Sequence, residues 1–321
     1  MKHPLVFLYP GQGSQYVGMG LDLYQTYPKA KEIFNQADSV LGFSLSSLCF
    51  TGSEHELNKD LNAQLAVYTV SCIITDIFRS EGIIPDAVTG YSAGFYGAAY
   101  SAGCFDFKQG LEIVRTAGQI LLDEGEKIDG TMSVIFGLSG REVEKLCREA
   151  GEISVAIFNT PRQIIVSGLS PSVKKVMEKS LSAGALDAYP LNVATAYHSE
   201  FVSNSGPHLL DSIQKDALQD PEIPIFSYTT LKQSQSKQEV KETMAMQLSR
   251  PVRWVELIQL FRSSGMRLCV EVGPGAVLSR TVRWIDRNIE MIYTDPTKRL
   301  NNVLSTCRSF REGIREPEAN Q

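Results

Sequence analysis

The segment 130–193 constrains the fold most, because apolar runs and helical patterns alternate there in a definite order. Strand-like apolar runs cover residues 132–138, 152–158, 163–169 and 185–193. Helical patterns cover 139–150 and 170–184, and each begins with a serine, as expected of a helix start. The order βαββαβ is that of the ferredoxin-like split unit. We therefore predict an inserted ferredoxin-like subdomain over 130–197; the alternative is that these elements continue one main sheet.

The segments on either side also alternate between strand and helix patterns. Residues 5–9 are an apolar run ended by a proline and a glycine, which is typical of a buried strand entering a tight turn. Residues 62–79 predict a long buried helix, and 87–89 a short strand followed by a turn and a helix of small residues. Further helices are expected over 19–38, 207–219, 239–246 and 255–264, further strands over 222–228 and from 266 to a Gly-Pro-Gly turn, and a polar connection over 231–238. We predict that residues 1–129 and 198–321 together form an α/β core with a parallel sheet.

The net charge of the chain restricts which kinds of macromolecule it can bind. The formal net charge of −5 argues against a nucleic-acid partner, because phosphate binding needs a basic surface. No run approaches the roughly 18 uninterrupted apolar residues of a membrane span, and the N-terminal sequence lacks the small-residue cleavage site of a secretory signal. We expect a cytoplasmic protein that binds neither nucleic acid nor membrane.

Cysteine and histidine are too scattered to indicate a disulfide framework or a metal site. The 6 cysteines contain no CxxC pair, which predicts reduced thiols, those in apolar runs being buried as small hydrophobic residues. The 4 histidines do not suggest a multi-histidine metal site. We expect no metal and no permanently bound cofactor.

A GYSAG pentapeptide, residues 90–94, lies between the strand 87–89 and the helix of small residues. In nucleophile-elbow enzymes two glycines permit a strained turn that lifts the serine hydroxyl above the sheet. The pentapeptide alone is weak evidence because glycine and serine are common, but its position between strand and helix fits. We predict that Ser92 is a nucleophile.

A serine nucleophile needs a base, and histidine is the usual one near neutral pH. His198 follows the last strand of the predicted insertion and lies downstream of Ser92, as the chain order of such enzymes requires. His3 and His55 have the surroundings of surface residues, and His208, which opens a predicted helix, is the competing candidate.

Donors for an oxyanion hole are also present. The backbone N–H of Ala93 starts the helix after the elbow, and the glycine-rich turn PGQGSQ at 10–15 offers Gln12 as a second donor. The alternative, which the residues leave equally open, is that 10–15 is a plain turn.

Taken in order, a series of motifs resembles the malonyl-CoA:acyl carrier protein transacylase family, which includes the acyltransferase domains of polyketide synthases. The motifs are YPGQGSQYVGMG, GYSAG, GTM, FNTPRQIIVSG, AYHS, QLSRPVRW and EVGPGAVL, and they span essentially the whole chain. The resemblance implies a hydrolase-like α/β core with a ferredoxin-like insertion, in agreement with the pattern above.

The resemblance also implies ping-pong chemistry. Ser92 takes an acyl group from one thioester and a pantetheine thiol removes it, so the phosphopantetheine of CoA or acyl carrier protein is substrate and not resident cofactor. Gln12 then lies beside the oxyanion hole with Ala93 as donor, and a main-chain carbonyl near Gln247 orients His198.

The same resemblance places four residues around the acyl group, namely Tyr91, Ala117, Asn159 and Tyr197. The family's usual elbow reads GHSLGE, whereas this chain has GYSAGF, so Tyr91, Ala93 and Phe95 are departures. Malonyl-specific members carry an arginine directly before the glycine of the helix LEIVRTAGQIL, where it pairs with the malonyl carboxylate. This chain has Ala117 there.

Arg115 does not replace the missing arginine by position alone. Two residues on a helix are a rotation of about 200°, so we expect Arg115 to point away from the pocket. The alternative is a shifted alignment that puts the pairing arginine elsewhere.

An unpaired buried malonyl carboxylate costs several kcal/mol. We therefore expect an acyltransferase-family enzyme that handles non-malonyl acyl thioesters of acyl carrier protein or CoA through acyl-Ser92, in polyketide or fatty acid synthesis. The acyl group leaves to a second thiol or, in an editing acyl hydrolase, to water. The alternative is a true malonyl-CoA:acyl carrier protein transacylase, and a further one is a non-catalytic module that docks a carrier protein.

Acyl carrier protein is the expected macromolecular partner and acyl-CoA the expected small one. Four arginines in the last third could help to dock an acidic carrier protein, namely Arg253, Arg280, Arg283 and Arg287. For any one of them, an ordinary solvated arginine is the simpler interpretation.

Overall fold

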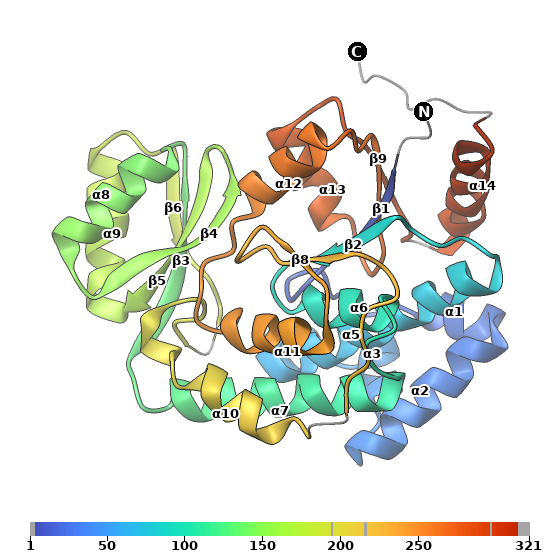
Figure 1. Ribbon diagram of the computed structural model, residues 1–321. Helices are drawn as coiled ribbons and strands as arrows, with labels where there is room; N and C mark the ends of the chain where they lie inside the picture. Colours follow the sequence, from blue (N-terminus) through green and yellow to red (C-terminus); the bar gives the residue numbers. More distant parts are fainter. Residues whose placement is uncertain (1–3, 194, 215–216, 296, 314–321) are drawn as a thin grey trace.

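The computed structural model describes residues 4–193, 195–214, 217–295 and 297–313, and it contains two sheets (Figure 1). The larger sheet has the order β10-β9-β1-β2-β7-β8. Its strands are β1 (Leu5–Tyr9), β2 (Ala87–Gly90), β7 (Ile225–Phe226), β8 (Gln233–Ser234), β9 (Leu268–Glu271) and β10 (Glu290–Tyr293). Neighbours are parallel except β7 and β8, which are antiparallel. The predicted parallel-sheet core is therefore present, with one antiparallel strand at its edge.

The smaller sheet is antiparallel and has the order β4-β5-β3-β6. Its strands are β3 (Gly130–Phe136), β4 (Ile153–Thr160), β5 (Gln163–Leu169) and β6 (Asp187–Pro190), and its helices are α8 (Gly140–Ala150) and α9 (Ser170–Ser182). This is the βαββαβ unit that the sequence predicts, in a sheet of its own, so the alternative of one continuous main sheet is wrong. The division into 1–129 with 198–321 and 130–197 stays a prediction.

The small sheet is apolar on both faces, which explains its nearly continuous hydrophobic runs. Side chains alternate along a strand, and Ile135 and Ile164 pack with α8 and α9 in a small separate core. Their neighbours Val134 and Ile165 belong to the main core instead. The small sheet therefore serves as a wall between its own helices and the rest of the molecule.

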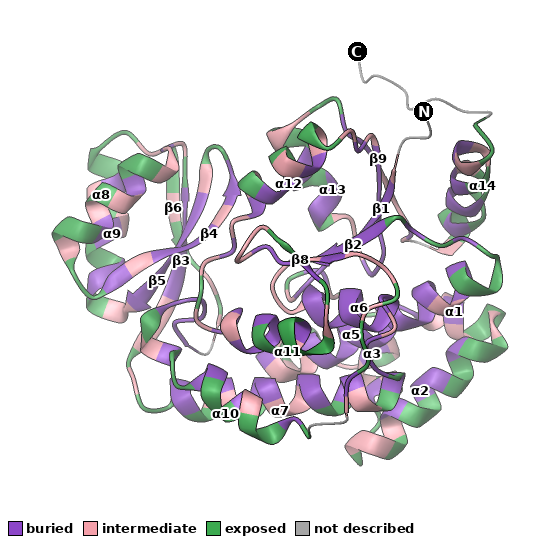
Figure 2. Cartoon of the chain, in the orientation of Figure 1, coloured by how far each residue is buried: buried purple, intermediate pink, exposed green. Residues whose placement is uncertain are grey.

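Helices surround the larger sheet on both sides (Figure 1). They are α1 (Leu21–Thr26), α2 (Pro28–Leu41), α3 (Leu45–Thr51), α4 (Glu54–Leu57), α5 (Asp60–Ser80), α6 (Gly94–Ser101), α7 (Phe107–Gly125), α10 (Ser205–Ser212), α11 (Lys237–Met246), α12 (Trp254–Ser263), α13 (Val277–Ile285) and α14 (Leu300–Arg311), with short 3₁₀ turns at Glu200–Val202 and Thr297–Arg299. Helix α5 packs against α6 and α7, lies behind α6 and α11 in the view of Figure 2, and has most of its residues buried. It is the one helix of the described residues long and apolar enough to cross a membrane, but 83% of its most apolar window is buried in the fold.

Several predicted elements differ from those observed. The single helix expected over 19–38 is two, because Pro28 lacks an N–H and begins a new helix at its first position. The strand expected over 222–228 is reduced to β7, the helix expected over 207–219 ends at Ser212, and residues 215–216 lie outside the described part. The polar connection 231–238 contains β8. Pairing with distant strands, which a local sequence pattern does not record, decides the extents of β7 and β8.

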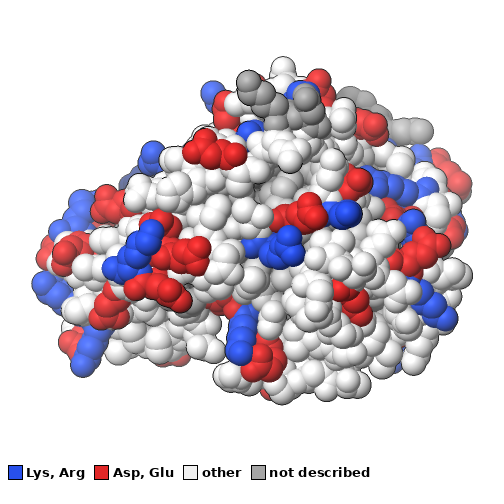
Figure 3. All heavy atoms as spheres, turned by 90° about the horizontal axis from the view of Figure 1, so that it is seen from below, with Lys and Arg blue, Asp and Glu red and all other residues white. Residues whose placement is uncertain are grey.

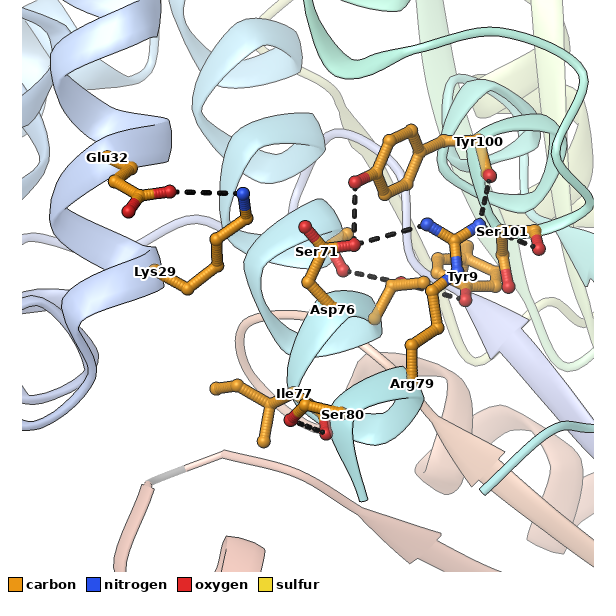
Figure 4. A network of polar contacts seen from close by, with 11 residues as sticks. Tyr9, Lys29, Glu32, Ser71, Asp76, Ile77, Arg79, Ser80, Tyr100 and Ser101 are labelled. Carbon is orange, nitrogen blue, oxygen red and sulfur yellow. Dashed lines mark hydrogen bonds and ion pairs between the residues drawn. The ribbon is translucent and has the colours of Figure 1, made fainter. Parts of the chain in front are cut away.

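A polar network fixes the far end of α6 to α5 (Figure 4). The Arg79 guanidinium donates to the carbonyl oxygens of Tyr100 at 2.7 Å and Ser101 at 3.1 Å, and pairs with the Asp76 carboxylate at 3.1 Å. The Tyr100 hydroxyl donates to the same carboxylate at 2.6 Å. A cation at the last carbonyls of a helix stabilises that end, so this network holds the C-terminal end of the helix that begins at the GYSAG turn.

Charged side chains of both signs are interspersed over the face seen from below (Figure 3). That face carries no broad field of one sign, in keeping with a net charge of −5 spread over 321 residues. All 6 cysteines are buried and unpaired with one another.

Candidate active site

The GYSAG turn joins β2 to α6 in a tight elbow. Ser92 has φ of 51°, a left-handed conformation that costs a non-glycine residue on the order of 1–3 kcal/mol. A Cβ on Gly90 would lie 2.0 Å from the carbonyl carbon of Gly94, and one on Gly94 would lie 2.1 Å from the carbonyl oxygen of Tyr9. Only glycine fits at both positions, so the chain can turn sharply enough to project the Ser92 side chain.

The Ser92 hydroxyl meets an imidazole. Its Oγ lies 2.8 Å from Nε2 of His198, across 106 positions of sequence. His198 is 7% exposed and also has a left-handed backbone, with φ of 56°. Its backbone N–H donates to the carbonyl of Leu248 at 3.1 Å. The loop after the small sheet is thereby tied to the segment before Arg250.

Two main-chain carbonyls hold the other side of the ring. Nδ1 of His198 lies 2.8 Å from the oxygen of Gln247 and 3.2 Å from that of Arg250. A carbonyl only accepts, so Nδ1 carries the proton and Nε2 is left as the acceptor. Burial lowers the pKa of His198 to about 4, although both carbonyls favour the charged ring. The ring is therefore neutral and able to accept a proton at pH 7.

The competing histidines lie elsewhere. His208 has a side chain 56% exposed, on α10, with Nδ1 3.6 Å from Glu124. The side chain of His55 is 83% exposed, on α4, and His3 lies outside the described residues. Of the histidines that the structure describes, only His198 contacts Ser92.

The turn 10–15 packs directly on the elbow. A Cβ on Gly11 would lie 2.4 Å from the carbonyl oxygen of Tyr91 and 3.4 Å from the backbone nitrogen of Ala93. Within the described part of the chain, no hydrogen bond uses the backbone N–H of Gln12 or of Ala93. Both N–H groups belong to residues that line the same pocket as Ser92, which is the arrangement expected of an oxyanion hole.

The side chain of Gln12 is fixed by residues that sequence reasoning did not select. Its Nε2 donates to the carboxylate of Asp60, and its Oε1 accepts from Gln64 at 3.2 Å. Asp60 also accepts from the hydroxyl of Tyr197 at 2.5 Å. One feature of the sequence could have pointed to Asp60. It is the acidic residue in the first turn of the long apolar helix α5, where the helix dipole stabilises a carboxylate.

Two further hydrogen bonds link the elbow residue Tyr91 to the strands of the small sheet. The Tyr91 hydroxyl donates to Asn159 at 3.0 Å, and the Asn159 amide donates to Gln163 at 2.7 Å. The ring of Tyr91 packs edge-on against Trp254, with ring centroids 5.2 Å apart. These contacts join the elbow to the small sheet.

The pocket at Ser92 has a volume of about 680 Å³. One wall is the inner face of the small sheet, with Met132, Val134, Ile157 and Ile165. Of the four residues expected around the acyl group, Tyr91, Asn159 and Tyr197 line the pocket and Ala117 does not.

The role of position 117 at the acyl group therefore stays a prediction. Ala117 is buried between helices, and Leu121, the next residue on that side of α7, reaches the pocket. Arg115 donates to the carbonyl of Val40 on α2 at 3.3 Å and is not part of the lining. None of the described lining residues is a lysine or an arginine.

Gln247 is itself anchored. The Tyr228 hydroxyl donates to its side-chain Oε1 at 2.8 Å, and both residues are buried. Sequence reasoning missed Tyr228 and the second carbonyl, that of Arg250. The described residues contain no group of three or more His, Cys, Asp or Glu side chains placed to hold a metal ion.

Comparisons with known proteins identify relatives of this chain. The family model described as "Acyl transferase domain" matches residues 6–292. The malonyl CoA-acyl carrier protein transacylase of Bacillus subtilis (strain 168) is 33% identical over 308 residues, covering 95% of this chain and 97% of the relative. The protein of the same name from Escherichia coli (strain K12) is 30% identical over 296 residues, covering 91% and 96%.

Solved structures resemble the whole chain. A malonyl-transacylase in complex with a type II PKS acyl carrier protein superposes with a TM-score of 0.90 at 29% identity, covering 94% of this chain and 99% of that one. The malonyl CoA-acyl carrier protein transacylase from Coxiella burnetii also gives 0.90, at 28% identity, covering 95% and 98%. The chain belongs to the acyltransferase family that contains the malonyl-CoA:acyl carrier protein transacylases.

Proposed function

We propose that the protein transfers acyl groups through a covalent acyl-Ser92 intermediate. The contact of 2.8 Å between Ser92 Oγ and the neutral ring of His198 carries this proposal. Nε2 takes the hydroxyl proton as Oγ attacks the thioester carbonyl, and the carbon–sulfur bond then breaks as the proton passes to the departing thiol. The backbone N–H groups of Gln12 and Ala93 stabilise the oxyanion.

The second half-reaction, in which the acyl group leaves Ser92, uses the same steps in the opposite order. A pantetheine thiol, or water in a hydrolase, gives its proton to His198 and attacks the acyl-Ser92 ester. The phosphopantetheine arm of an acyl carrier protein or CoA is thus substrate and not resident cofactor. We propose acyl carrier protein and acyl-CoA as partners, by analogy with the relatives' names. We also propose the cytoplasm as the location.

The pocket favours an acyl group without a free carboxylate. Its described lining has apolar side chains along the small sheet and neither lysine nor arginine, so a malonyl carboxylate would lack an ionic partner. Neutral acyl groups would pack against that wall without such a cost. Release to water by the same intermediate would make the protein an editing acyl hydrolase.

Malonyl transfer is the second candidate. It is favoured by the relatives, since both of those described above are named malonyl CoA-acyl carrier protein transacylases and match nearly the whole chain. A non-catalytic docking module is the weakest candidate, because such a module has no need of a serine–histidine hydrogen bond.

The deciding experiment mixes the protein with acetyl, butyryl and malonyl thioesters of CoA and of acyl carrier protein and follows acyl-enzyme and free acid by mass spectrometry. We expect acyl addition that disappears in Ser92→Ala and persists in Ser182→Ala, an exposed serine of α9. Free acid without a thiol acceptor would identify hydrolysis. Malonyl loading faster than butyryl would select the second candidate, and no adduct from any thioester would refute acyl transfer.

A further inference from the structure

A buried carboxylate lies behind the wall of the Ser92 pocket. Asp60, the first residue of α5, is 7% exposed. It accepts hydrogen bonds from the side-chain amide of Gln12 and from the Tyr197 hydroxyl, the latter at 2.5 Å. Both donors line the pocket, so only one layer of side chains separates the carboxylate from the acyl group.

The geometry of α5 turns Asp60 toward that space. Residues four apart share a helix face, and Gln64, one turn after Asp60, lines the pocket and donates to Gln12 at 3.2 Å. Helix α7 closes the same corner, since a Cβ on Gly118 would lie 2.6 Å from Leu61. Leu121 of α7 also lines the pocket. Asp60 therefore lies at the corner where α5, α7 and the turn 10–15 bound the pocket.

The charged side chains described in the lining and directly behind it are carboxylates. The described lining holds no lysine or arginine and includes one further carboxylate, that of Glu54. Burial raises the pKa of Tyr197, and the charge of Asp60 raises it further, so the tyrosine remains a hydrogen-bond donor to the carboxylate. The Tyr197 hydroxyl gives its one proton to Asp60, and one of the two N–H groups of the Gln12 side-chain amide is given to the same carboxylate.

We propose that Asp60 determines specificity by repelling acyl groups that carry a free carboxylate. The inference rests on the proposed acyl-Ser92 chemistry and names the substrate class of that site, uncharged acyl thioesters. A malonyl carboxylate would enter a water-poor corner beside a fixed like charge, whereas an acyl group of similar size without charge would meet no such barrier.

The first test compares malonyl with butyryl loading onto Ser92 from the same thiol carrier. In Asp60→Asn, the ratio of malonyl to butyryl acylation rates should rise by about tenfold or more, while the Asp60→Glu ratio stays close to wild type. Asp123→Asn, which removes an accepting carboxylate from α7, is the matched control and should leave the ratio unchanged. An unchanged ratio in Asp60→Asn would overturn the proposal.

A binding test separates this inference from the proposed chemistry and needs no variant of Asp60. Calorimetry on the Ser92→Ala protein compares malonyl-pantetheine with its neutral amide isostere, malonamyl-pantetheine. We expect the amide to bind about tenfold more tightly or better. Equal binding, or tighter binding of malonyl, would contradict the role of Asp60 whether or not Ser92 is acylated.

Discussion

The carbonyl oxygen of Gln247 lies 2.8 Å from Nδ1 of His198, in the place where many serine enzymes put a carboxylate. A neutral carbonyl fixes the tautomer of the ring but adds less stabilisation to the imidazolium than a full negative charge does. Burial disfavours the charged ring, and the carbonyls offset that cost only in part. The pH dependence of acylation follows from this relationship.

The acid limb of acylation should lie well below the ordinary histidine range. Because the pKa of His198 is lowered to about 4, the ring stays a neutral base as the pH falls from 7 to 5, and protonation removes the base only near pH 4. The rate of Ser92 acylation, measured by quenched flow across this range, should be flat and then fall. An acid limb near 6.5 would contradict the burial argument.

Stability should change over the same range, so the fold must be checked at each pH. The unfolded chain binds a proton at the ordinary histidine pKa of about 6.5, while the folded chain binds it only near 4. Between those values the unfolded state holds more protons, so this histidine makes the fold less stable as the pH falls. Circular dichroism at each pH separates loss of the base from loss of the fold.

Replacing Gly94 by alanine should destroy the elbow. The new Cβ would lie 2.1 Å from the carbonyl oxygen of Tyr9, and backbone cannot yield as a side-chain tip can. We expect the free energy of unfolding to fall by ~3 kcal/mol or more, with loss of Ser92 acylation. Gly97→Ala, in the same helix, meets the Tyr9 ring at 2.9 Å. It should cost much less in urea unfolding, and equal losses would contradict the role given to the elbow.

The features readable from sequence are those set by short stretches of chain. The βαββαβ order follows from local periodicity, and the elbow follows from glycines that flank Ser92 within one pentapeptide. Sequence order also placed His198 after the small sheet, and the family resemblance implied its contact with a main-chain carbonyl near Gln247. These predictions hold because each depends on few contacts between distant parts of the chain.

The features that were missed depend on which distant side chains meet. Nothing local indicates that Asp60 pairs with Gln12 and Tyr197, since the three come from separate segments. Whether position 117 or 121 of α7 faces the pocket depends on the rotation of that helix against α5. The edge strand β8 exists only because β7 lies beside it.

Removing Arg115 should not alter the choice of acyl group. Its guanidinium donates to the carbonyl of Val40 at 3.3 Å and lies outside the pocket lining. In Arg115→Ala we expect an unchanged ratio of malonyl to butyryl loading and a fall in unfolding free energy of about 1 kcal/mol. A selective loss of malonyl loading would mean that this arginine binds the acyl carboxylate.

Of the four arginines expected to help dock a carrier protein, Arg280 on helix α13 lies nearest in sequence to a residue of the pocket lining, and Arg283 lies on the same helix. Helix α13 starts at Val277, which lines the mouth of the pocket, and its exposed residues include Arg280, Arg283 and Trp284, the last 70% exposed. Arg253, in contrast, is paired with Glu256. An acidic carrier protein that lies along α13 would therefore hold its pantetheine arm near the entrance.

Reversing both charges in Arg280→Glu with Arg283→Glu should raise KM for an acyl carrier protein thioester by about tenfold, because complementary charge is replaced by repulsion. The kcat/KM for a short acyl-pantetheine without phosphate should be unchanged, since that substrate does not contact α13. Lys174→Glu with Lys175→Glu, an exposed pair on α9, is the matched control for net charge. The KM effect should shrink as salt rises and screens the charges. Equal KM in both double variants would place carrier-protein docking on another surface.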